Sequence, residues 1–415
     1  TVTNPPPFAN SSVCRIRDKD TAMRIAMVGP FGFHPNKTMR SRALGLARPF
    51  IQRGHQVILI MPPWQTPDEA DRRWQEDGVE VCYVPLRGGL PGITSAMLRV
   101  LRDWRPDVVH CFKPKAYSGL VAWWLWQFQR TRLPLVVDSD DWEGWGGWNN
   151  LAPYSPVQKW FFAWQEQWGL RHNHALTVAS RALQSIAWSL GVAREQVVYL
   201  PNGSGIEVDA AQTGQPVAEL KQKLGVAGRP VLLLYSRLFE FATERLVTVL
   251  RAVKTAVPDL AILAVGTGLY EQDAAALRTQ LQEADGLDHV VDVGWVETAV
   301  LPSILCAADI GLYLMEDTLL NRTKCPVKLA DMVALGIPVV AEAVGQVSEY
   351  VQHQQTGLLV PSGDAAGMAQ AIVHLLQHPV ERERLAVNAR AHYTAHFAWE
   401  KLAAQLEAVY VNVQR

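Results

Sequence analysis

Short apolar, β-branched runs alternate with stretches of helical periodicity along most of the chain. In the first half these runs are Arg24–Val28, Gln56–Met61, Val79–Val84, Asp107–Phe112, Leu133–Asp138, Ala175–Ala179 and Gln196–Leu200. In the second half they are Val231–Tyr235, Leu260–Val265, His289–Val293, Asp309–Leu314, Ile337–Ala341 and Gly357–Val360. Repeated strand–helix units indicate parallel sheets covered by helices on both faces. The pattern therefore predicts an α/β fold with two doubly wound, Rossmann-like domains.

The alternation breaks in the stretch Pro201–Pro230, which is rich in Gly, Pro and Gln. We therefore predict a first domain over residues 23–204, a linker over 205–229 and a second domain over 230–398. Residues 1–22 are expected to form a flexible N-terminal segment. Residues 399–415 are expected to form a last helix, for which the first domain is a candidate docking surface.

Composition limits the classes of function. The 415 residues carry a net charge of −1, which argues against a broad nucleic-acid-binding surface. The five cysteines are scattered, with no C-x-x-C pair, so we expect reduced thiols in a cytoplasmic protein. No apolar run reaches the roughly 18 residues of a membrane-spanning helix, and the N-terminal stretch lacks the apolar core of a signal peptide.

Residues 325–341 carry the most informative local pattern. Pro326 can begin a helix without losing a needed N–H group, and Gly336 can end one. Lys328 and Asp331 share a face of this helix. The helix N-terminus and the ammonium group favour a phosphate, and the carboxylate can accept hydrogen bonds from sugar hydroxyls. The alternative is a capped core helix with a solvated Lys–Asp pair.

Ligands of doubly wound sheets bind at the carboxyl ends of the strands, so the residues that follow each strand are candidates. After the first strand, Lys37, Thr38 and Arg40 form a basic loop that can meet an anion, unless their charges are simply solvated. After the fourth strand, Lys113 is a candidate for binding an anionic acceptor. His110 lies on that strand and is a candidate acid or base, although such histidines more often belong to the core.

An acidic loop with Asp138, Asp140 and Asp141 follows the fifth strand. Carboxylates that cluster after a buried strand raise one another's pKa, which suits proton transfer. The spacing Asp138-x-Asp140 also matches the D-x-D with which some transferases hold a divalent metal, and one aspartate can simply cap a helix. We favour an acidic loop that lines a cleft, with no metal site.

In the second half, Arg237, Gly266 and Val296 come directly after successive strands. An arginine can donate two parallel hydrogen bonds to phosphate. Gly266 allows close backbone approach, and the backbone at Val296 can meet a planar base. The fold should bring Arg237, Lys328 and Asp331 to one rim of the second sheet, which favours the phosphate-binding interpretation of Lys328.

Fifteen tryptophans are many for this length, and Trp160, Trp164 and Trp168 have helical spacing. We expect these three to pack in the core or between helices of the first domain. The alternative is a face that contacts the inner side of a membrane peripherally, or stacking platforms for a sugar or lipid acceptor.

Five segments of the second half resemble GT-B glycosyltransferases, in particular retaining family 4 and the group 1 glycosyl transferase domain. They are Val231–Leu238, Ala261–Gly268, Val293–Val296, Ala308–Leu314 and Cys325–Ala341. The first half is similar more loosely, through Arg53–Val57 and Pro106–His110. The resemblance implies two domains that face each other across a cleft. The second domain would bind a nucleotide-diphosphate sugar, and the first a sugar, lipid-linked or small-molecule acceptor, with no cofactor.

On this resemblance, Arg237 matches a phosphate-binding arginine, Asp331 a ribose-binding carboxylate and Val296 a backbone contact to the base. Thr323 takes the donor-side position of a glutamate that contacts the transferred sugar, and Ala242 replaces a lysine. Two departures lie in the first half. Lys37-Thr38 replaces a Gly-Gly pair, and Phe112 replaces the second histidine of H-x-H, which leaves only His110.

Departure of the sugar places negative charge on the β-phosphate, and preorganised donors stabilise that charge. We expect Arg237, Lys328 and the helix N-terminus to supply them, without a metal ion. Retention of the anomeric configuration is implied by the resemblance. Asp141 and Asp138 are candidate bases for the acceptor hydroxyl. Two alternatives stay open: an inactive nucleotide-sugar-binding subunit and a nucleotide-sugar epimerase.

Overall fold

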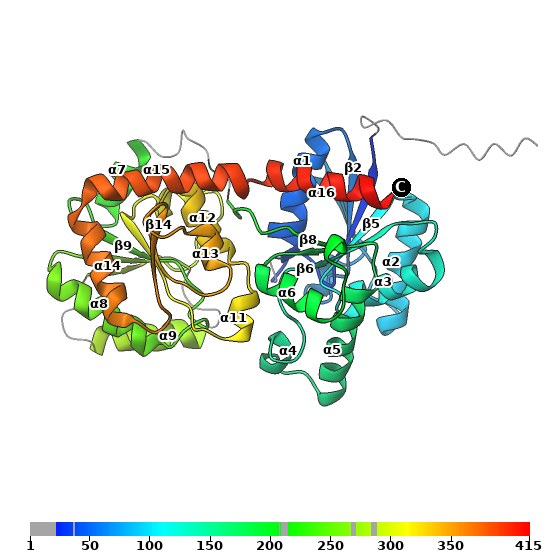
Figure 1. The fold of residues 1–415 in the computed structure, drawn as a ribbon, viewed down its shortest axis with the longest axis horizontal. Coiled ribbons are helices and arrows are strands. Elements are labelled where there is room, and N and C mark those ends of the chain that lie inside the picture. The colour runs from blue at the N-terminus through cyan, green and yellow to red at the C-terminus, as the bar shows by residue number, and fades with distance from the viewer. Residues whose placement is uncertain (1–21, 36–37, 207, 209–214, 267–270, 284–288) are drawn as a thin grey trace, which may run out of the picture.

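The computed structural model describes residues 22–35, 38–206, 208, 215–266, 271–283 and 289–415. The expected flexible segment therefore lies, apart from its last residue, outside the described residues, as does Lys37. The described chain forms two parallel-sheet α/β units side by side (Figure 1). The predicted fold class is confirmed.

The first sheet has eight strands in the order β3-β4-β2-β1-β5-β6-β7-β8. In chain order they are β1 (Arg24–Val28), β2 (Gln56–Met61), β3 (Arg73–Glu76), β4 (Val79–Tyr83), β5 (Val108–Phe112), β6 (Leu135–Ser139), β7 (Ala175–Val178) and β8 (Val197–Tyr199). All neighbours are parallel except β3 and β4. The sequence analysis missed β3 because its residues are polar and it lies at the edge. The Asp77-Gly78 turn, with φ of 53° and 80°, was the available hairpin signal.

The second sheet is wholly parallel, with six strands in the order β11-β10-β9-β12-β13-β14. They are β9 (Val231–Leu234), β10 (Ala261–Ala264), β11 (Val290–Asp292), β12 (Ile310–Tyr313), β13 (Val339–Glu342) and β14 (Gly357–Val360). Each coincides with a predicted run to within a few residues at its ends. Because such strands are buried on both faces, their continuous apolar runs were clear in the sequence.

Helices cover both faces of the first sheet. They are α1 (Leu44–Gln52), α2 (Gly89–Trp104), α3 (Ala116–Gln129), α4 (Trp148–Leu151), α5 (Pro156–Arg171) and α6 (Arg181–Ser189), with short turns at Met39–Ala43, Pro67–Glu69 and Arg194–Gln196. Alternate residues of β1 serve opposite faces: Ile25 and Met27 pack with α1, while Ala26 and Val28 pack with α2 and α3.

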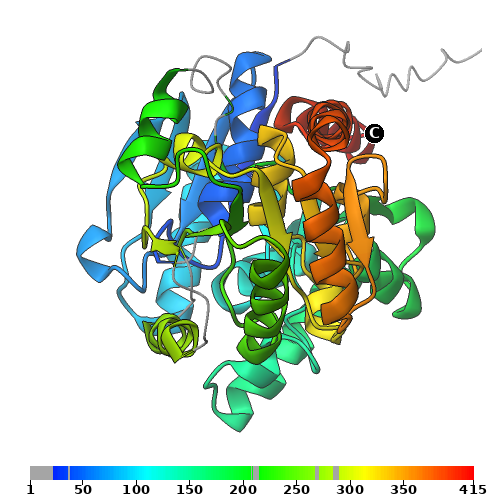
Figure 2. The same ribbon diagram turned by 90° about the vertical axis from the view of Figure 1, so that its left-hand side faces the viewer.

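The second sheet is covered in the same way. Its helices are α7 (Gln215–Lys223), α8 (Thr243–Ala256), α9 (Glu271–Glu283), α10 (Leu301–Leu305), α11 (Leu319–Thr323), α12 (Val327–Leu335), α13 (Val347–Tyr350), α14 (Ala365–Gln377) and α15 (Pro379–His396). On one face α8 and α14 lie side by side (Figure 2). On the other face α12 packs against α15.

The last helix, α16 (Trp399–Val413), crosses back to the first sheet and packs beside α1 (Figure 1). Its Leu402, Leu406 and Tyr410 are buried in the core of that sheet. The chain passes between the two sheets twice, after β8 and at the start of α16. These two segments contact each other, since Trp399 Nε1 donates to Ser204 O at 2.7 Å. A Cβ on Gly203 would lie 2.7 Å from the Trp399 ring, so this close crossing requires glycine.

Candidate active site between the two sheets

Loops that follow strands of one sheet meet loops that follow strands of the other. Ser180 Oγ, after β7, donates to the carbonyl of Thr323 at 2.7 Å. The ring centre of Trp148, on α4, lies 5.5 Å from the ring centre of Phe239, which follows β9. The carboxyl ends of the two sheets, where doubly wound folds bind ligands, therefore face a shared region.

The segment 325–341 has the predicted structure. Pro326 is the N-cap of α12, and Gly336 ends it with φ of 73°. Lys328, in the first turn, donates from Nζ to Gly266 O at 2.8 Å and lies 4.3 Å from the Tyr235 ring centre. Gly266 has φ of 51°, and a Cβ there would lie 3.7 Å from Nζ. The loops after β9 and β10 and the start of α12 thus converge around one ammonium group.

Arg237 is exposed in the loop after β9. Burial and Asp331 raise the pKa of Tyr235, and the charge of Arg237, two residues further along the chain, acts in the opposite sense. Burial lowers the pKa of Lys324, and the charge of Arg237 acts in the same sense. The structure therefore brings two predicted phosphate-binding cations to the same strand end, beside a helix N-terminus.

Val296 is half-buried after the exposed Trp295, whose ring centre lies 5.8 Å from Lys328 Nζ. This arrangement puts a flat indole beside the cation cluster, where a base or sugar can stack. The role of the Val296 backbone in base binding stays a prediction.

Asp331 is buried against Ser204 and Gly205, where the predicted linker begins, and does not face open surface. Its Oδ1 accepts from Ser204 Oγ and from Gly205 N, both at 2.7 Å, and its Oδ2 accepts from Tyr235 Oη at 3.1 Å. Burial raises its pKa, while these bonds and Lys328 act in the opposite sense. Contact with a ribose would require one of these bonds to be exchanged.

Thr323 does not offer its side chain to a ligand in this structure, contrary to the donor-binding prediction. It is fully buried, and its hydroxyl donates to Leu320 O at 2.8 Å. The neighbouring Lys324, which the sequence analysis did not select, points instead into the contact between the two sheets.

The prediction for Lys113 as an anion-binding group is wrong in this geometry. Its buried ammonium lies 2.9 Å from Asp140 Oδ1, 3.3 Å from Asp141 Oδ2 and 3.0 Å from Glu143 Oε1. Burial would raise the pKa of Glu143, but Lys113 and Lys115 outweigh burial and lower it to about 2. The charge of the acidic loop is therefore largely compensated by two lysines of the loop after β5.

Asp141 is the partly exposed carboxylate of this cluster. Burial raises its pKa, Lys113 lowers it, and the charge of Lys324 reaches it from the second sheet. Its candidacy as a base is compatible with this position. Glu166 lies deeper, where burial and Glu143 raise its pKa to about 8.

Asp138 is a structural residue, which corrects its prediction as a base. It is fully buried and accepts from Arg42 Nε at 2.8 Å, from Arg42 Nη2 at 2.6 Å and from Thr177 Oγ1 at 2.6 Å. Arg42 also reaches Leu200 O and Asn202 Oδ1. Arg42 pairs with Asp138 and Lys113 with Asp140, so both carboxylates of the D-x-D pair already have cationic partners.

His110 is likewise a core residue and not an acceptor-side acid or base. Its ring nitrogens contact Tyr410 Oη at 2.7 Å and Thr177 Oγ1 at 3.1 Å, and burial and Arg42 hold its pKa well below the usual value. The histidine is therefore neutral. Its partner on α16 lies 300 positions away, beyond the reach of local sequence patterns.

The basic loop after β1 is only partly described. Lys37 lies outside the described residues, and Thr38 is half-buried without a side-chain capping bond. Arg40 Nη2 pairs with Glu76 Oε1 at 2.6 Å on the surface, so its charge is already satisfied there. The anion-binding prediction for Arg40 is therefore not supported by its contacts.

The expected core packing of the tryptophan stripe is wrong for two of its members. Trp160 is 65% exposed, and Trp164 is also exposed. Trp168 stacks on His172 with ring centres 4.3 Å apart. Within the described ranges, no helix is long and apolar enough to cross a membrane.

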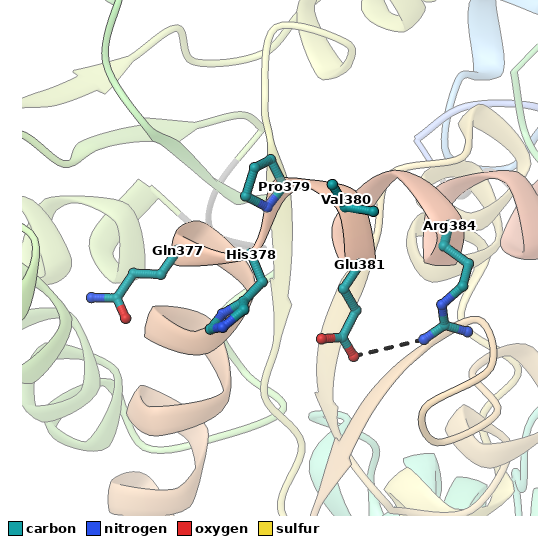
Figure 3. Close-up of a pocket in the computed structure, with 6 residues that line it drawn as sticks. All are labelled: Gln377, His378, Pro379, Val380, Glu381 and Arg384. Atoms are coloured by element: carbon teal, nitrogen blue, oxygen red, sulfur yellow. Dashed lines mark ion pairs between the residues drawn. The ribbon is translucent and has the colours of Figure 1, made fainter.

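A pocket at the junction of α14 and α15 holds none of the candidate residues (Figure 3). It is lined by Gln377, His378, Pro379, Val380, Glu381 and Arg384. Glu381 and Arg384 pair there at 3.7 Å. Since the pocket lies on helices and not at strand ends, we assign it no role in the site.

Comparisons with known proteins agree with this architecture. Residues 37–203 match the model of the glycosyl transferase 4-like domain, and residues 229–378 match that of the glycosyl transferases group 1. A GDP-mannose-dependent α-(1-6)-phosphatidylinositol monomannoside mannosyltransferase of Mycobacterium tuberculosis is 30% identical over 85% of this chain and 89% of its own. A phosphatidyl-myo-inositol mannosyltransferase of Mycobacterium leprae is 27% identical over 94% and 97%.

Two solved structures share the fold. Anabaena Alr3699/HepE in complex with UDP and glucose superposes with a TM-score of 0.69 at 18% identity, over 93% of this chain and 99% of its own. Sucrose-phosphate synthase from Thermosynechococcus elongatus gives 0.70 at 21%, over 94% and 98%. With both halves matched and the strand-end site in place, this chain belongs to the GT-B glycosyltransferases of the family 4 type, enzymes that use nucleotide-sugar donors.

Proposed function

We propose that this glycosyltransferase transfers a hexose, namely mannose from GDP-mannose, to a hydroxyl of a lipid-borne polyol. We further propose that transfer retains the anomeric configuration and uses no divalent metal. The observation that carries the proposal is that Lys328, at the α12 N-terminus, contacts Tyr235 at the end of β9, and the exposed Arg237 follows Tyr235 by two residues.

This arrangement suits a diphosphate. The helix N-terminus carries unpaired N–H groups and partial positive charge, and the two side chains add full charges. As the sugar leaves, charge grows on the β-phosphate, and each preorganised donor is worth about 2.7–4 kcal/mol in comparable oxyanion sites. Because side chains and helix supply this charge, we propose no metal ion.

The choice of donor and acceptor rests on the relatives. Curated relatives are named as GDP-mannose-dependent enzymes that act on phosphatidylinositol mannosides or form α-linkages. An α-linked product from an α-linked donor is retention. On the acceptor side we propose Asp141 as the base, since its pKa is raised by burial and its side chain is partly exposed.

A thermal-shift screen with GDP, UDP, ADP and TDP and their sugars tests the donor site. We expect stabilisation by GDP-mannose, lost in Arg237→Ala and Lys328→Ala. Arg40→Ala, which removes an arginine paired on the surface, is the control and should bind as the wild type does. Unchanged binding in both site variants would refute the site, and binding without transfer or donor hydrolysis would instead support an inactive subunit.

We also propose peripheral contact of α5 with the membrane that carries the acceptor. Val157, Trp160 and Trp164 are exposed on this helix, and Leu151 is exposed at the end of α4. Large apolar side chains on one exposed helix face favour the bilayer interface.

Flotation with phosphatidylinositol liposomes at low salt tests this contact. We expect binding by the wild type, and at least tenfold less by a Trp160→Ala/Trp164→Ala variant. Trp64→Ala, which removes an exposed tryptophan elsewhere, should float like the wild type. Equal flotation of all three proteins would contradict the contact through α5.

A further inference from the structure

A lysine–glutamate pair is buried where the two sheets meet. Lys324, between α11 and α12, places Nζ 2.9 Å from Glu240 Oε1 in the loop after β9. Lys324 is 7% exposed and Glu240 is 6% exposed. A buried ion pair that begins three residues after Arg237 calls for an explanation.

The pair is incompletely satisfied. Glu240 Oε2 is buried and has no hydrogen-bond partner among the described residues. Leaving a buried carboxylate oxygen without a donor costs stability, so such an atom in a native structure calls for a specific explanation, such as a functional role or a bound water or ion. An uncharged O–H donor, as in a sugar hydroxyl, would satisfy this oxygen without adding charge.

Aromatic rings from both sheets enclose the pair. Lys324 Nζ lies 3.8 Å from the ring centre of Phe239, in the second sheet's loop, and 5.6 Å from that of Trp148 on α4. A charged oxygen and an ammonium between aromatic faces match a pyranose, which presents hydroxyls at its edge and C–H groups on its faces.

The pair also lies where the loop that carries Arg237 meets the first sheet's side: Glu240 is three residues after Arg237, and Trp148 of α4 flanks Lys324. Burial lowers the pKa of Lys324, Glu240 and, from the first sheet, Asp141 raise it, and Arg237 lowers it further. The charges that act on Lys324 thus come from the proposed phosphate-binding side and from the proposed base. The transferred sugar must occupy this same interval.

We infer that Glu240 and Lys324 recognise the hydroxyls of the transferred sugar, with Glu240 Oε2 accepting from one hydroxyl and Lys324 donating to a neighbouring oxygen. This assignment rests on the proposed function and deepens it. It supplies contacts to the sugar that the buried Thr323 does not offer. Separation of Trp148 from Phe239 would admit the donor.

Isothermal titration with GDP and GDP-mannose, repeated with UDP and UDP-glucose, separates sugar recognition from nucleotide binding. The variants are Glu240→Gln, which keeps the side-chain shape, and Lys324→Met, which keeps most of the apolar stem. Arg322→Met is the matched control, because Arg322 is two residues away but pairs with Asp317 on the surface. Thermal melts verify that each variant is folded.

We expect both site variants to bind the nucleotide sugar at least tenfold more weakly while the affinity for the free nucleoside diphosphate changes less than twofold. Arg322→Met should leave both affinities unchanged. Parallel loss of both affinities, or loss of neither, overturns the sugar-recognition role. If the wild type binds none of the four ligands, the proposed function fails as well, which distinguishes the two failures.

Discussion

Replacement of Arg42 by methionine tests how strongly this buried side chain holds the first sheet to residues 200–202, which follow β8. Arg42 is fully buried, makes a bidentate pair with Asp138, and donates to Leu200 O at 2.9 Å and Asn202 Oδ1 at 2.8 Å. Arg42→Met keeps an unbranched side chain but leaves the Asp138 carboxylate buried without its countercharge. Removing one partner of a buried ion pair costs about 3–5 kcal/mol.

Tryptophan fluorescence during urea unfolding measures this loss, because all tryptophans except Trp295 and Trp399 precede residue 205. The transition then reports mainly on the first sheet, which matters because a two-domain chain need not unfold in one step. Arg40→Met is the control, since its pair with Glu76 is exposed and worth about 0–1 kcal/mol.

We expect Arg42→Met to lower the unfolding midpoint well beyond Arg40→Met, and Arg42→Met/Asp138→Leu to recover part of the loss because no lone charge stays buried. Equal midpoints for Arg42→Met and Arg40→Met would refute the reasoning. The reasoning would also fail if the double variant lost more unfolding free energy than Arg42→Met and Asp138→Leu lose together as single variants.

Two further predictions concern the same domain. Burial and Glu143 raise the pKa of Glu166 to about 8 in the folded state. Its protonation therefore contributes fully to the free energy of unfolding below the unfolded pKa near 4.5, and this contribution is lost by the time the pH has risen through 8. Glu166→Gln, which imitates the protonated acid, should therefore match the wild type at pH 5 and exceed it in urea midpoint at pH 9; equal midpoints at both pH values would argue against a raised pKa. Tyr410 of α16 is fully buried against Phe50 and bonds His110, so Tyr410→Ala should destabilise the first domain by about 3–5 kcal/mol, while Lys401→Ala on the exposed face should have little effect in the same fluorescence assay. A Tyr410→Ala protein as stable as Lys401→Ala would mean that α16 is not part of that core.

The sequence predicted part of the donor-side site at the strand ends of the second sheet. Of the predicted group Arg237, Lys328 and Asp331, both Lys328 and Asp331 contact Tyr235, two residues before Arg237, because parallel strands place their carboxyl ends at one edge whatever the details of packing. The helix at 327–335 followed from Pro326 and Gly336 alone. What escaped was Lys324, whose neighbours Glu240 and Trp148 lie far away in sequence.

The acceptor side was read less well. Lys113 and Asp138 stand at or near strand ends, and His110 lies within β5; all three were candidates, although the core was the commoner role expected for His110. Their partners decide otherwise: Asp140 and Glu143 neutralise Lys113, Arg42 holds Asp138, and Tyr410 binds His110. Only burial and the identity of a distant partner distinguish a structural charge from a reactive one, and neither is written in local spacing.

By itself, the sequence determined the two parallel sheets and the cation-bearing helix start, because periodicity and capping act between residues close together in the chain. The tertiary structure alone decided which charged groups are paired within the fold and where α16 docks. It also decided that a buried oxygen of Glu240 finds no hydrogen-bond partner in the described part of the chain. Those outcomes depend on the free energy of burying a charge, which is set by groups that only folding brings within a few ångströms.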